Sequence, residues 1–269
     1  MRTAIIVESR LSSRRLPRKA LRPIGGEPML GLLLERLKRS RRADVICVAT
    51  SSEHADGEIA ALAHAKGVEV YRGSLDDVLG RVLGALDSVG ADVIVEITGD
   101  CPLADPRIID QAIERYFAGG ADYVTNILDG YTYPIGMDVQ IYSRALLAGI
   151  DMLCTNPAVR VDVTPYVYWH GERFRLLNLL APPPLSRPGY RLCVDVIEDF
   201  EVIEAVDCAL GGDGPAYGLA AINRFLDANP ALARHNLNQP DAFIAPRPKG
   251  PYRAEVMPLP PDIAGNQDA

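Results

Sequence analysis

The segment from Thr3 to Lys19 has the sequence Thr-Ala-Ile-Ile-Val-Glu-Ser-Arg-Leu-Ser-Ser-Arg-Arg-Leu-Pro-Arg-Lys, and the rest of the chain is organised around it. Its first part, Thr3–Val7, is apolar and rich in β-branched residues, which predicts a strand. The following twelve residues, Glu8–Lys19, hold four arginines, one lysine and three serines. A helical pattern begins near Pro28. The segment therefore predicts a strand that leads into an anion-binding loop ahead of a helix.

Composition allows one large α/β domain or two small ones, because the chain has 269 residues and 48% of them are hydrophobic. The five cysteines are widely spaced, with no C-x-x-C pair and no histidine cluster beside them. We expect them to be reduced and either structural or incidental. The sequence shows no signal-peptide pattern and no apolar segment of membrane-spanning length, so we expect a cytoplasmic protein without a membrane partner.

The net charge of -7 argues against a nucleic-acid partner, but the charge is unevenly distributed. Residues 1–42 carry twelve basic and three acidic side chains, which leaves 16 basic and 32 acidic side chains in the rest of the chain. Part of the basic excess is a helix-end cluster that we interpret as a solvated face: Arg36, Lys38, Arg39, Arg41 and Arg42. No amphipathic period accounts for the loop arginines Arg10, Arg14, Arg15 and Arg18.

Apolar runs alternate with helical patterns through the first hundred residues. Strands are predicted at Thr3–Val7, Asp44–Thr50, Val68–Tyr71 and Asp92–Thr98, and helices at Pro28–Arg39, Glu53–Lys66 and Leu75–Val89. This alternation predicts an α/β fold with a mostly parallel, doubly wound sheet and right-handed crossovers. Ligands of such sheets bind at the carboxyl ends of the strands, where the first loop lies.

The pattern changes after residue 122. Further strands are predicted at Asp122–Asn126, Met137–Tyr142, Phe174–Leu180 and Arg191–Asp195, and helices at Pro165–Trp169, Glu198–Leu210 and Ala216–Ala228. We expect a single domain over residues 1–235, in which residues 122–188 form a smaller α+β insertion that completes a sugar site or a subunit contact. Residues 236–269 contain seven prolines and predict an extended tail that is wrapped or disordered.

The first loop lacks the glycine patterns of a Walker A loop and of a dinucleotide-binding turn. The alternative to an anion-binding role is that the loop is a solvated turn. Two carboxylates favour a phosphate site. Asp100 follows the apolar strand at Asp92–Thr98, and Asp195 ends the predicted strand Arg191–Asp195. Either acid alone would more often be a helix cap. Together, beside a basic loop, they are what a Mg²⁺-bound triphosphate requires.

Several motifs resemble the acylneuraminate cytidylyltransferase family, and within it the branch of spore-coat polysaccharide biosynthesis proteins. The motifs occur in order at residues 8–21, 49–51, 71–81, 97–103 and 194–199. The resemblance implies a nucleotide-diphospho-sugar transferase fold of the Rossmann-like type. It also implies a Mg²⁺-dependent transfer of CMP from CTP to a sugar, with an acidic keto-sugar as the expected acceptor and surface polysaccharide as the destination.

The resemblance also implies roles for individual residues. Lys19 and Arg10 would stabilise the reacting phosphates, and Asp100 and Asp195 would hold Mg²⁺. The remaining nucleotide-binding candidates are Ser13, Arg15, Thr50, Arg72 and Asp77. The sugar-site candidates are Asn126, Asp138 and Arg160, for which turn-forming or surface roles are the alternative. Family members commonly pair through the middle lobe, so a homodimer is possible.

The chain departs from the family pattern at four positions. Ser12 and Arg18 stand where the family loop has glycine, which would permit a positive φ. Val161 and Asp162 stand where the family usually has Glu and His, so the acceptor can differ from the common ones. Two other hypotheses remain: a glycosyltransferase of the related fold, and a nucleotide-binding protein that has lost catalysis. The first is less well supported, because Asp100-Cys-Pro lacks the second acid of the Asp-x-Asp motif that such glycosyltransferases usually carry.

Overall fold

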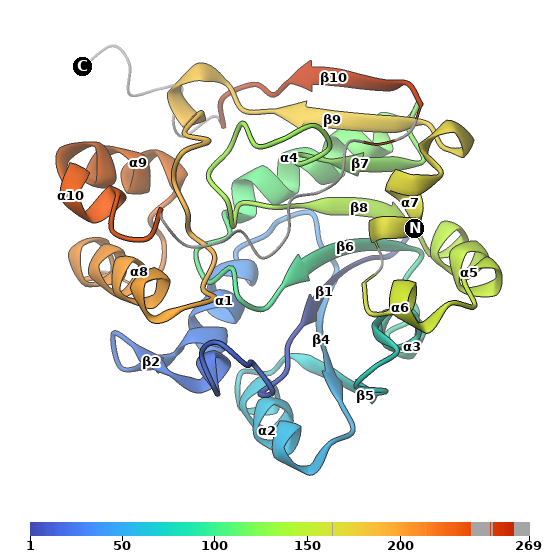
Figure 1. The fold of residues 1–269 in the computed structure, drawn as a ribbon, viewed down its shortest axis with the longest axis horizontal. Helices are drawn as coiled ribbons and strands as arrows, with labels where there is room; N and C mark the ends of the chain where they lie inside the picture. The colour runs from blue at the N-terminus through green and yellow to red at the C-terminus, as the bar shows by residue number, and fades with distance from the viewer. Residues whose placement is uncertain (163, 213, 238–247, 249, 261–269) are drawn as a thin grey trace.

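The computed structural model describes residues 1–162, 164–212, 214–237, 248 and 250–260. An eight-stranded sheet with the order β10-β9-β7-β8-β6-β1-β4-β5 crosses the molecule (Figure 1). Its strands are β1 (Thr3–Glu8), β4 (Val45–Ser51), β5 (Glu69–Gly73), β6 (Val93–Thr98), β7 (Tyr123–Thr125), β8 (Gln140–Ser143), β9 (Leu176–Leu180) and β10 (Tyr252–Val256). A small antiparallel pair, β2 (Pro23–Ile24) and β3 (Glu27–Pro28), follows the first loop.

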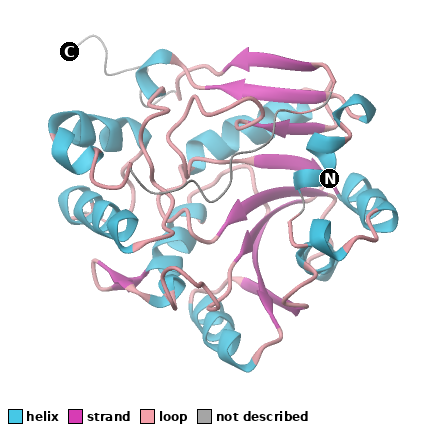
Figure 2. Cartoon of the chain, in the orientation of Figure 1, coloured by secondary structure: helices cyan, strands magenta, loops and turns pink. Residues whose placement is uncertain are grey.

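Helices cover both faces of the sheet (Figure 2). The α-helices described are α1 (Met29–Leu37), α2 (Gly57–Ala65), α3 (Val78–Ser88), α4 (Pro106–Phe117), α5 (Arg144–Leu153), α6 (Pro157–Arg160), α7 (Thr164–Trp169), α8 (Ile197–Leu210), α9 (Leu219–Ala228) and α10 (Pro230–Ala233). The last three, α8, α9 and α10, pack together in a separate apolar cluster beside the sheet. Side chains of β1 alternate between the faces, because successive residues of a strand point in opposite directions. Ala4 and Ile6 pack with α3, whereas Ile5 and Val7 pack with α1.

The predicted α/β class and the mostly parallel, doubly wound sheet are confirmed. β1 lies between β4 and β6 and is parallel to both. β8 is the exception, since it runs antiparallel to β6 and to β7. The strands within residues 122–188 join this same sheet, so the insertion extends the main core and has no sheet of its own.

One predicted strand, Arg191–Asp195, is wrong. The position beside β6 is taken by β8, so this segment instead crosses the carboxyl end of the sheet and makes one isolated bridge, between Ile135 and Arg191. The amide of Val194 donates to the carbonyl of Asp100 at 2.8 Å. Gly136 makes the close approach possible: its φ is +96°, and a Cβ there would lie 2.6 Å from the carbonyl carbon of Leu192.

The tail contributes β10, which pairs in parallel with β9 at the edge of the sheet. Residues 238–247, 249 and 261–269 lie outside the described residues, and the division into a domain over 1–235 and a tail over 236–269 stays a prediction. The interpretation of Arg36 as solvated is wrong, since its guanidinium is buried and donates to the carbonyls of Leu103 and Pro215. Among the helices of the described residues, none has both the length and the apolar character needed to cross a bilayer.

Candidate active site

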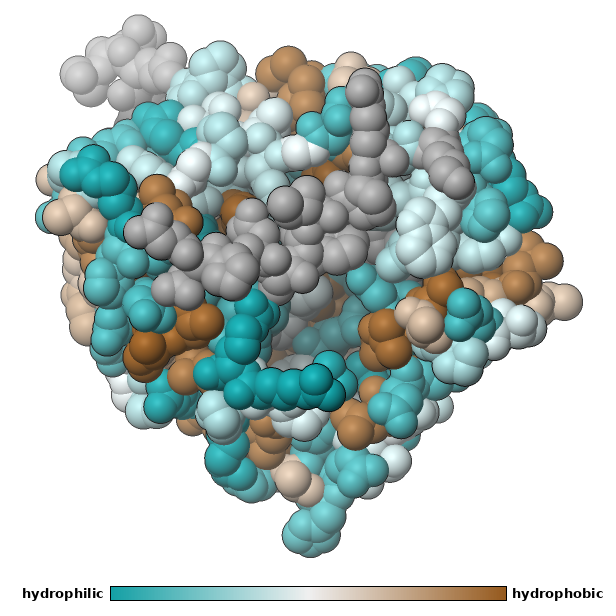
Figure 3. Space-filling view, in the orientation of Figure 1, coloured by the Kyte–Doolittle hydropathy of each residue, from teal (hydrophilic) through white to brown (hydrophobic). Residues whose placement is uncertain are grey.

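A cavity of about 650 Å³ opens at the carboxyl ends of β1 and β6. Figure 3 shows the molecule hollowed near the centre of this face, with hydrophilic side chains around the opening. The cavity is lined on the loop side by Arg10, Ser12, Ser13, Arg14, Arg15 and Lys19, on the strand-end side by Glu8, Thr98, Gly99 and Asp100, and on a third side by Leu75, Asp76, Val78 and Arg81; Asp195 lies across from the loop. This basic, polar cavity has the size and the chemistry of a nucleotide site.

The loop keeps the conformation that a glycine would favour, although Arg18 stands at that position. Arg18 has φ +58° and ψ +25°, and it is the one non-glycine residue with a positive φ in the described part of the chain. Its guanidinium points outward and makes a two-pronged ion pair with Glu58, with N–O distances of 3.0 and 2.6 Å. The amide of Leu11 is held by Asp56 at 2.7 Å. The loop is thus fixed by its contacts with the β4–α2 region.

Lys19 is the centre of the site. Its Nζ atom donates to the carbonyl of Val194 at 2.6 Å, to Asp100 Oδ2 at 2.9 Å and to Asp195 Oδ1 at 3.2 Å. Although burial opposes its charge, the carboxylates of Asp100 and Asp195 raise the pKa of Lys19 above its ordinary value. In turn, although burial opposes ionisation, Lys19 holds the pKa of Asp100 below its ordinary value. Lys19 and Asp100 are therefore charged at neutral pH.

Asp195 is held from two sides. Arg15 contacts Oδ1 at 2.8 Å from the loop, and Arg191 donates to Oδ2 at 2.8 Å from beneath. Arg191 is buried and also donates to Asp199 at 2.9 Å. Asp199 accepts the backbone amides of Asp195 at 2.8 Å and Val196 at 3.1 Å, where α8 begins. Charged hydrogen bonds in this buried network fix the direction of the Asp195 carboxylate.

A second, smaller cavity of about 270 Å³ adjoins the first, and both are lined by Glu8, Thr98, Asp100, Val161 and Asp195. Its other walls come from β6 and the turn after it, from β8 and the loop before it, from the turn after α6 and from the segment before α8. The residues are Glu96, Cys101, Ile127, Tyr131, Ile135, Asp138, Gln140, Asp162, Arg191 and Cys193. Burial raises the pKa of Asp138 to about 7. A ligand in this cavity would lie next to a ligand in the first.

The structure brings together most of the predicted site residues. Arg10, Ser13, Arg15, Lys19, Asp100 and Asp195 line the first cavity, and Asp138 lines the second. Five others are not among the described residues along either cavity: Thr50, Arg72, Asp77, Asn126 and Arg160.

These five have contacts of their own. Thr50 is fully buried in β4, and Arg72 donates to the carbonyls of Ser51 and Glu53. Asp77 begins α3 by accepting the amide of Gly80 and pairs with Arg160. The buried amide of Asn126 donates to the carbonyl of Met137 at 2.7 Å and accepts the amide of Val139 at 3.0 Å. Their direct ligand contacts stay predictions, and their observed contacts shape the walls around the cavities.

The sequence analysis did not single out the pair of acidic side chains Glu8 and Glu96, which line the second cavity. The pKa of Glu96 is well above its ordinary value, because burial and the nearby Glu8 both oppose ionisation. Tyr142 donates a hydrogen bond to Glu96, and Arg81 lies 3.8 Å from Glu8. The sequence does indicate this pair, because a glutamate within the apolar strand Val-Ile-Val-Glu-Ile-Thr is unusual. The pairing of Arg191 with Asp199 could not be predicted from the sequence, since it depends on where the segment before α8 crosses the sheet.

The carboxylates of Asp100 and Asp195 suit a hard divalent cation. Both make contact with one atom, Lys19 Nζ, so their oxygens converge on a single point that already carries positive charge. Mg²⁺ takes oxygen ligands, and it commonly uses one or two carboxylates together with phosphate and water. The two carboxylates beside a basic phosphate loop therefore fit the ion that the sequence predicted.

Known proteins are similar to this chain in sequence and in fold, and together they define it as an α/β nucleotidyltransferase. A family model described as Cytidylyltransferase matches residues 4–145. The structure of a cytidylyltransferase from Leptospira borgpetersenii is similar with a TM-score of 0.82 at 31% identity, over 90% of this chain and 100% of that chain. The spore coat polysaccharide biosynthesis protein SpsF of Bacillus subtilis is 33% identical over 233 residues, which are 85% of this chain and 95% of that protein. A 3-deoxy-manno-octulosonate cytidylyltransferase of Chlorobaculum tepidum is 39% identical over 122 residues, 45% of this chain and 48% of that protein.

The chain belongs to the cytidylyltransferase family. It is a nucleotidyltransferase with the nucleotide-sugar transferase fold that the sequence predicted.

Proposed function

We propose that the protein transfers CMP from CTP to a sugar hydroxyl, with Mg²⁺ bound and pyrophosphate released, in the synthesis of a surface polysaccharide. The observation that carries the proposal is the convergence of Lys19, Asp100 and Asp195 on one point at the edge of a basic cavity. The similarity to a spore coat polysaccharide biosynthesis protein and to an octulosonate cytidylyltransferase supports CTP, a sugar acceptor and the pathway class. The narrower assignment to the acylneuraminate cytidylyltransferase family, in its spore-coat polysaccharide branch, belongs to this proposal.

The loop would bind the triphosphate. Arg10, Arg15 and Lys19 line the same cavity, and cations aimed at the phosphates stabilise the charge that builds up as the sugar oxygen attacks the α-phosphorus. Ser13 already accepts the amide of Leu16 at 3.4 Å, so its hydroxyl hydrogen points elsewhere and can be donated to a phosphate oxygen. Lys19 would move from the carboxylates to the phosphates when the nucleotide binds.

The nucleoside would lie along the wall formed by Leu75, Asp76 and Val78. Asp77 shapes this wall by beginning α3, and its pair with Arg160, at 2.8 Å, ties the wall to α6. We therefore propose Asp77 and Arg160 as positioning residues. Thr50 and Arg72 would act in the same indirect way, through β4 and the turn before α2.

Mg²⁺ would be held by Asp100 and Asp195. When bound, it would neutralise phosphate charge and orient the α-phosphoryl group. Arg191 keeps the Asp195 carboxylate directed at the ion, and Gly99 lets Asp100 come close to the end of β1, since a Cβ at Gly99 would lie 2.6 Å from the carbonyl oxygen of Glu8. The protein supplies a fixed pair of carboxylates, and the loop supplies the opposing cations.

The acceptor would occupy the second cavity, next to Asp138. The resemblance favours an acidic keto-sugar, but Arg191 is the one basic side chain among the described residues along this cavity, and it is already paired with Asp195 and Asp199. An acceptor carboxylate would therefore meet mainly carboxyl groups there. The choice between acidic and neutral sugars has to be made by experiment. Asn126 would support the cavity by holding the loop at Met137 and Val139.

Pairing of two copies through residues 122–188 stays part of the proposal. Four large apolar side chains in this region are exposed, Met152 by 83%, Leu153 by 57%, Val161 by 56% and Trp169 by 41%. Hydrophobic side chains also gather near α5 at the edge of the face in Figure 3. Sedimentation equilibrium of the full chain would show a dimer, and a monomer at every concentration would contradict the pairing.

The function is tested by incubating the protein with each of the four nucleoside triphosphates, Mg²⁺ and a panel of acidic and neutral sugars, while pyrophosphate is measured. Release that needs both CTP and one sugar is the expected result. Tight CTP binding without release for any sugar would instead indicate a nucleotide-binding protein that has lost catalysis. Consumption of a nucleotide sugar would indicate a glycosyltransferase.

A further inference from the structure

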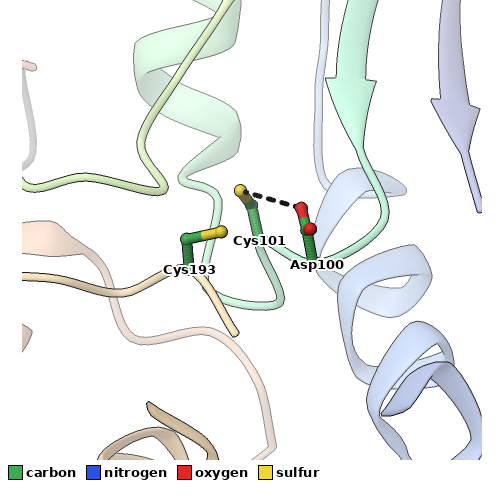
Figure 4. A group of neighbouring side chains, drawn as sticks. All are labelled: Asp100, Cys101 and Cys193. Carbon is green, nitrogen blue, oxygen red and sulfur yellow. Dashed lines mark hydrogen bonds between the residues drawn. The ribbon is translucent and has the colours of Figure 1, made fainter. Parts of the chain in front are cut away.

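Two cysteines far apart in the sequence meet beside Asp100. Cys101 follows Asp100 in the turn after β6, and Cys193 lies on the segment before α8 (Figure 4). One ligand atom from each of Asp100, Cys101 and Cys193 lies within 4.8 Å of the other two. Cys101 Sγ is 3.7 Å from Asp100 Oδ1, and both cysteines line the second cavity. A small ion can therefore reach all three atoms from that cavity.

The fold holds these groups in place independently of the thiols. The amide of Val194 donates to the carbonyl of Asp100 at 2.8 Å, and the amide of Leu192 donates to the carbonyl of Ile135 at 2.7 Å. The first bond fixes the segment that carries Cys193 against the turn that carries Cys101, and the second fixes it against the loop between β7 and β8. The approach of the two sulfurs is thus built into the crossing of the segments.

Asp100 directs its two oxygens to different neighbours. Oδ2 accepts from Lys19 and faces Asp195, which is the side proposed for Mg²⁺, whereas Oδ1 faces the sulfur of Cys101. Mg²⁺ prefers oxygen ligands, while thiolates favour softer cations such as Zn²⁺. In a tetrahedral Zn²⁺ site with Zn–S bonds of about 2.3 Å, the ligand atoms are about 3.7 Å apart, so a contraction of about 1 Å would close the site.

We propose that Asp100, Cys101 and Cys193 form a binding site for a thiophilic divalent cation of the Zn²⁺ class, distinct from the Mg²⁺ position. On binding, each thiol gives its proton to the solvent, and the two thiolates and Asp100 Oδ1 bind the ion, with water as the fourth ligand. One consequence rests on the proposed function: an ion there fills part of the acceptor cavity and draws Asp100 away from Mg²⁺, so it inhibits transfer.

Co²⁺ is the probe for the site, because cobalt bound to thiolate gives an intense charge-transfer absorption band that cobalt bound to carboxylates lacks. The full-length protein, reduced and metal-free, is titrated with Co²⁺ in excess Mg²⁺, and Zn²⁺ is then added in competition. We expect one Co²⁺ per chain with the thiolate band, and displacement by Zn²⁺. Cys193→Ser and Cys101→Ser should each lose the band and bind Zn²⁺ at least 10-fold more weakly. Cys208→Ser, which changes an exposed cysteine on α8, is the matched control and should keep the band.

A wild-type protein without the band, a band that persists in both Cys101→Ser and Cys193→Ser, or a band lost in Cys208→Ser would overturn the site. Circular dichroism of each variant shows whether it is folded, and two separate serine variants keep the test decisive if one of them does not fold. The absorption readout needs neither CTP nor a sugar. A protein that shows the band but releases no pyrophosphate would therefore refute the proposed function and leave the metal site standing.

Discussion

Lys19→Ala separates the two roles that the structure gives to this lysine. In the ligand-free protein, Lys19 Nζ contacts the carbonyl of Val194 at 2.6 Å, Asp100 at 2.9 Å and Asp195 at 3.2 Å. A hydrogen bond to a charged group contributes about 1.5–3 kcal/mol. Mg²⁺ must displace at least one such contact to bind between the carboxylates. Removal of the ammonium group should therefore tighten Mg²⁺ binding without nucleotide by about 10- to 100-fold.

The same substitution should slow catalysis. Loss of one preorganised cation at the reacting phosphates typically costs about 3–4 kcal/mol, so we expect turnover to fall by about 10²- to 10³-fold. Stability should fall less, by about 1–3 kcal/mol, because Asp195 keeps Arg15 and Arg191.

Calorimetric titration with Mg²⁺, pyrophosphate release and urea unfolding measure the three quantities. Lys38→Ala, which removes an exposed lysine paired with Glu35 on α1, is the control and should change none of the three by much. A folded Lys19→Ala protein with near-wild-type pyrophosphate release, or with unchanged Mg²⁺ affinity, would refute the reasoning.

Three further predictions follow from single contacts. The free energy of unfolding in urea should be lower for Arg18→Val than for Arg18→Gly by about 2 kcal/mol, because a β-branched residue is strained at φ +58°. Equal free energies of unfolding would show that the loop has another conformation. Arg191→Met should lower the free energy of unfolding by about 3–5 kcal/mol, since it leaves the buried Asp199 without its cation, and a loss below 1 kcal/mol would contradict that pairing. Burial raises the pKa of Asp138 to about 7, above its unfolded value of 3.8, so its ionisation should cost stability progressively as the pH rises from about 4 to above 7. Asp138→Asn should therefore be more stable than the wild type by on the order of 4 kcal/mol at pH 8 and about equal to it at pH 4. Urea unfolding at both pH values measures this. A difference in the free energy of unfolding that is the same at both pH values would disprove the raised pKa of Asp138.

The sequence predicted the parts of the fold that depend on local periodicity. The strands β1, β4, β5 and β6 and the helices between them follow apolar patterns that are typical of a buried parallel sheet. The segment Arg191–Asp195 has the same apolar pattern as a strand, yet its place in the sheet is taken by β8. Which of two apolar segments joins the sheet depends on strand pairing between residues far apart in the sequence. A local sequence pattern gives no information about that pairing.

The candidate site was predictable where residue type and chain position agree. Asp100 at a strand end and Lys19 in the first loop both reach the cavity, because the carboxyl ends of parallel strands meet at one edge. Asn126 and Arg160 matched family motifs as well, but their side chains are used in contacts between loops and helices. Motif position alone does not separate a residue that touches a ligand from one that supports the wall behind it.

Glycine positions show the same limit. The glycine of the family pattern would permit a left-handed backbone at position 18, and that backbone is present although the residue is arginine. The surrounding contacts, including the amide of Leu11 held by Asp56 and the ion pair of Arg18 with Glu58, select the conformation. A substitution at a glycine position therefore tests the strength of the contacts around it.

The proposed function depends most on the transfer of the α-phosphate of CTP to a sugar at the site of Lys19, Asp100 and Asp195. The most direct measurement follows CTP labelled at the α-phosphate through incubation with Mg²⁺ and the sugar panel, for the wild type and for Asp100→Asn. We predict that the label moves to a CMP-sugar with one acceptor in the wild type and stays in CTP in Asp100→Asn. Label that remains in CTP with every sugar, or that is transferred equally well by Asp100→Asn, would contradict the central claim.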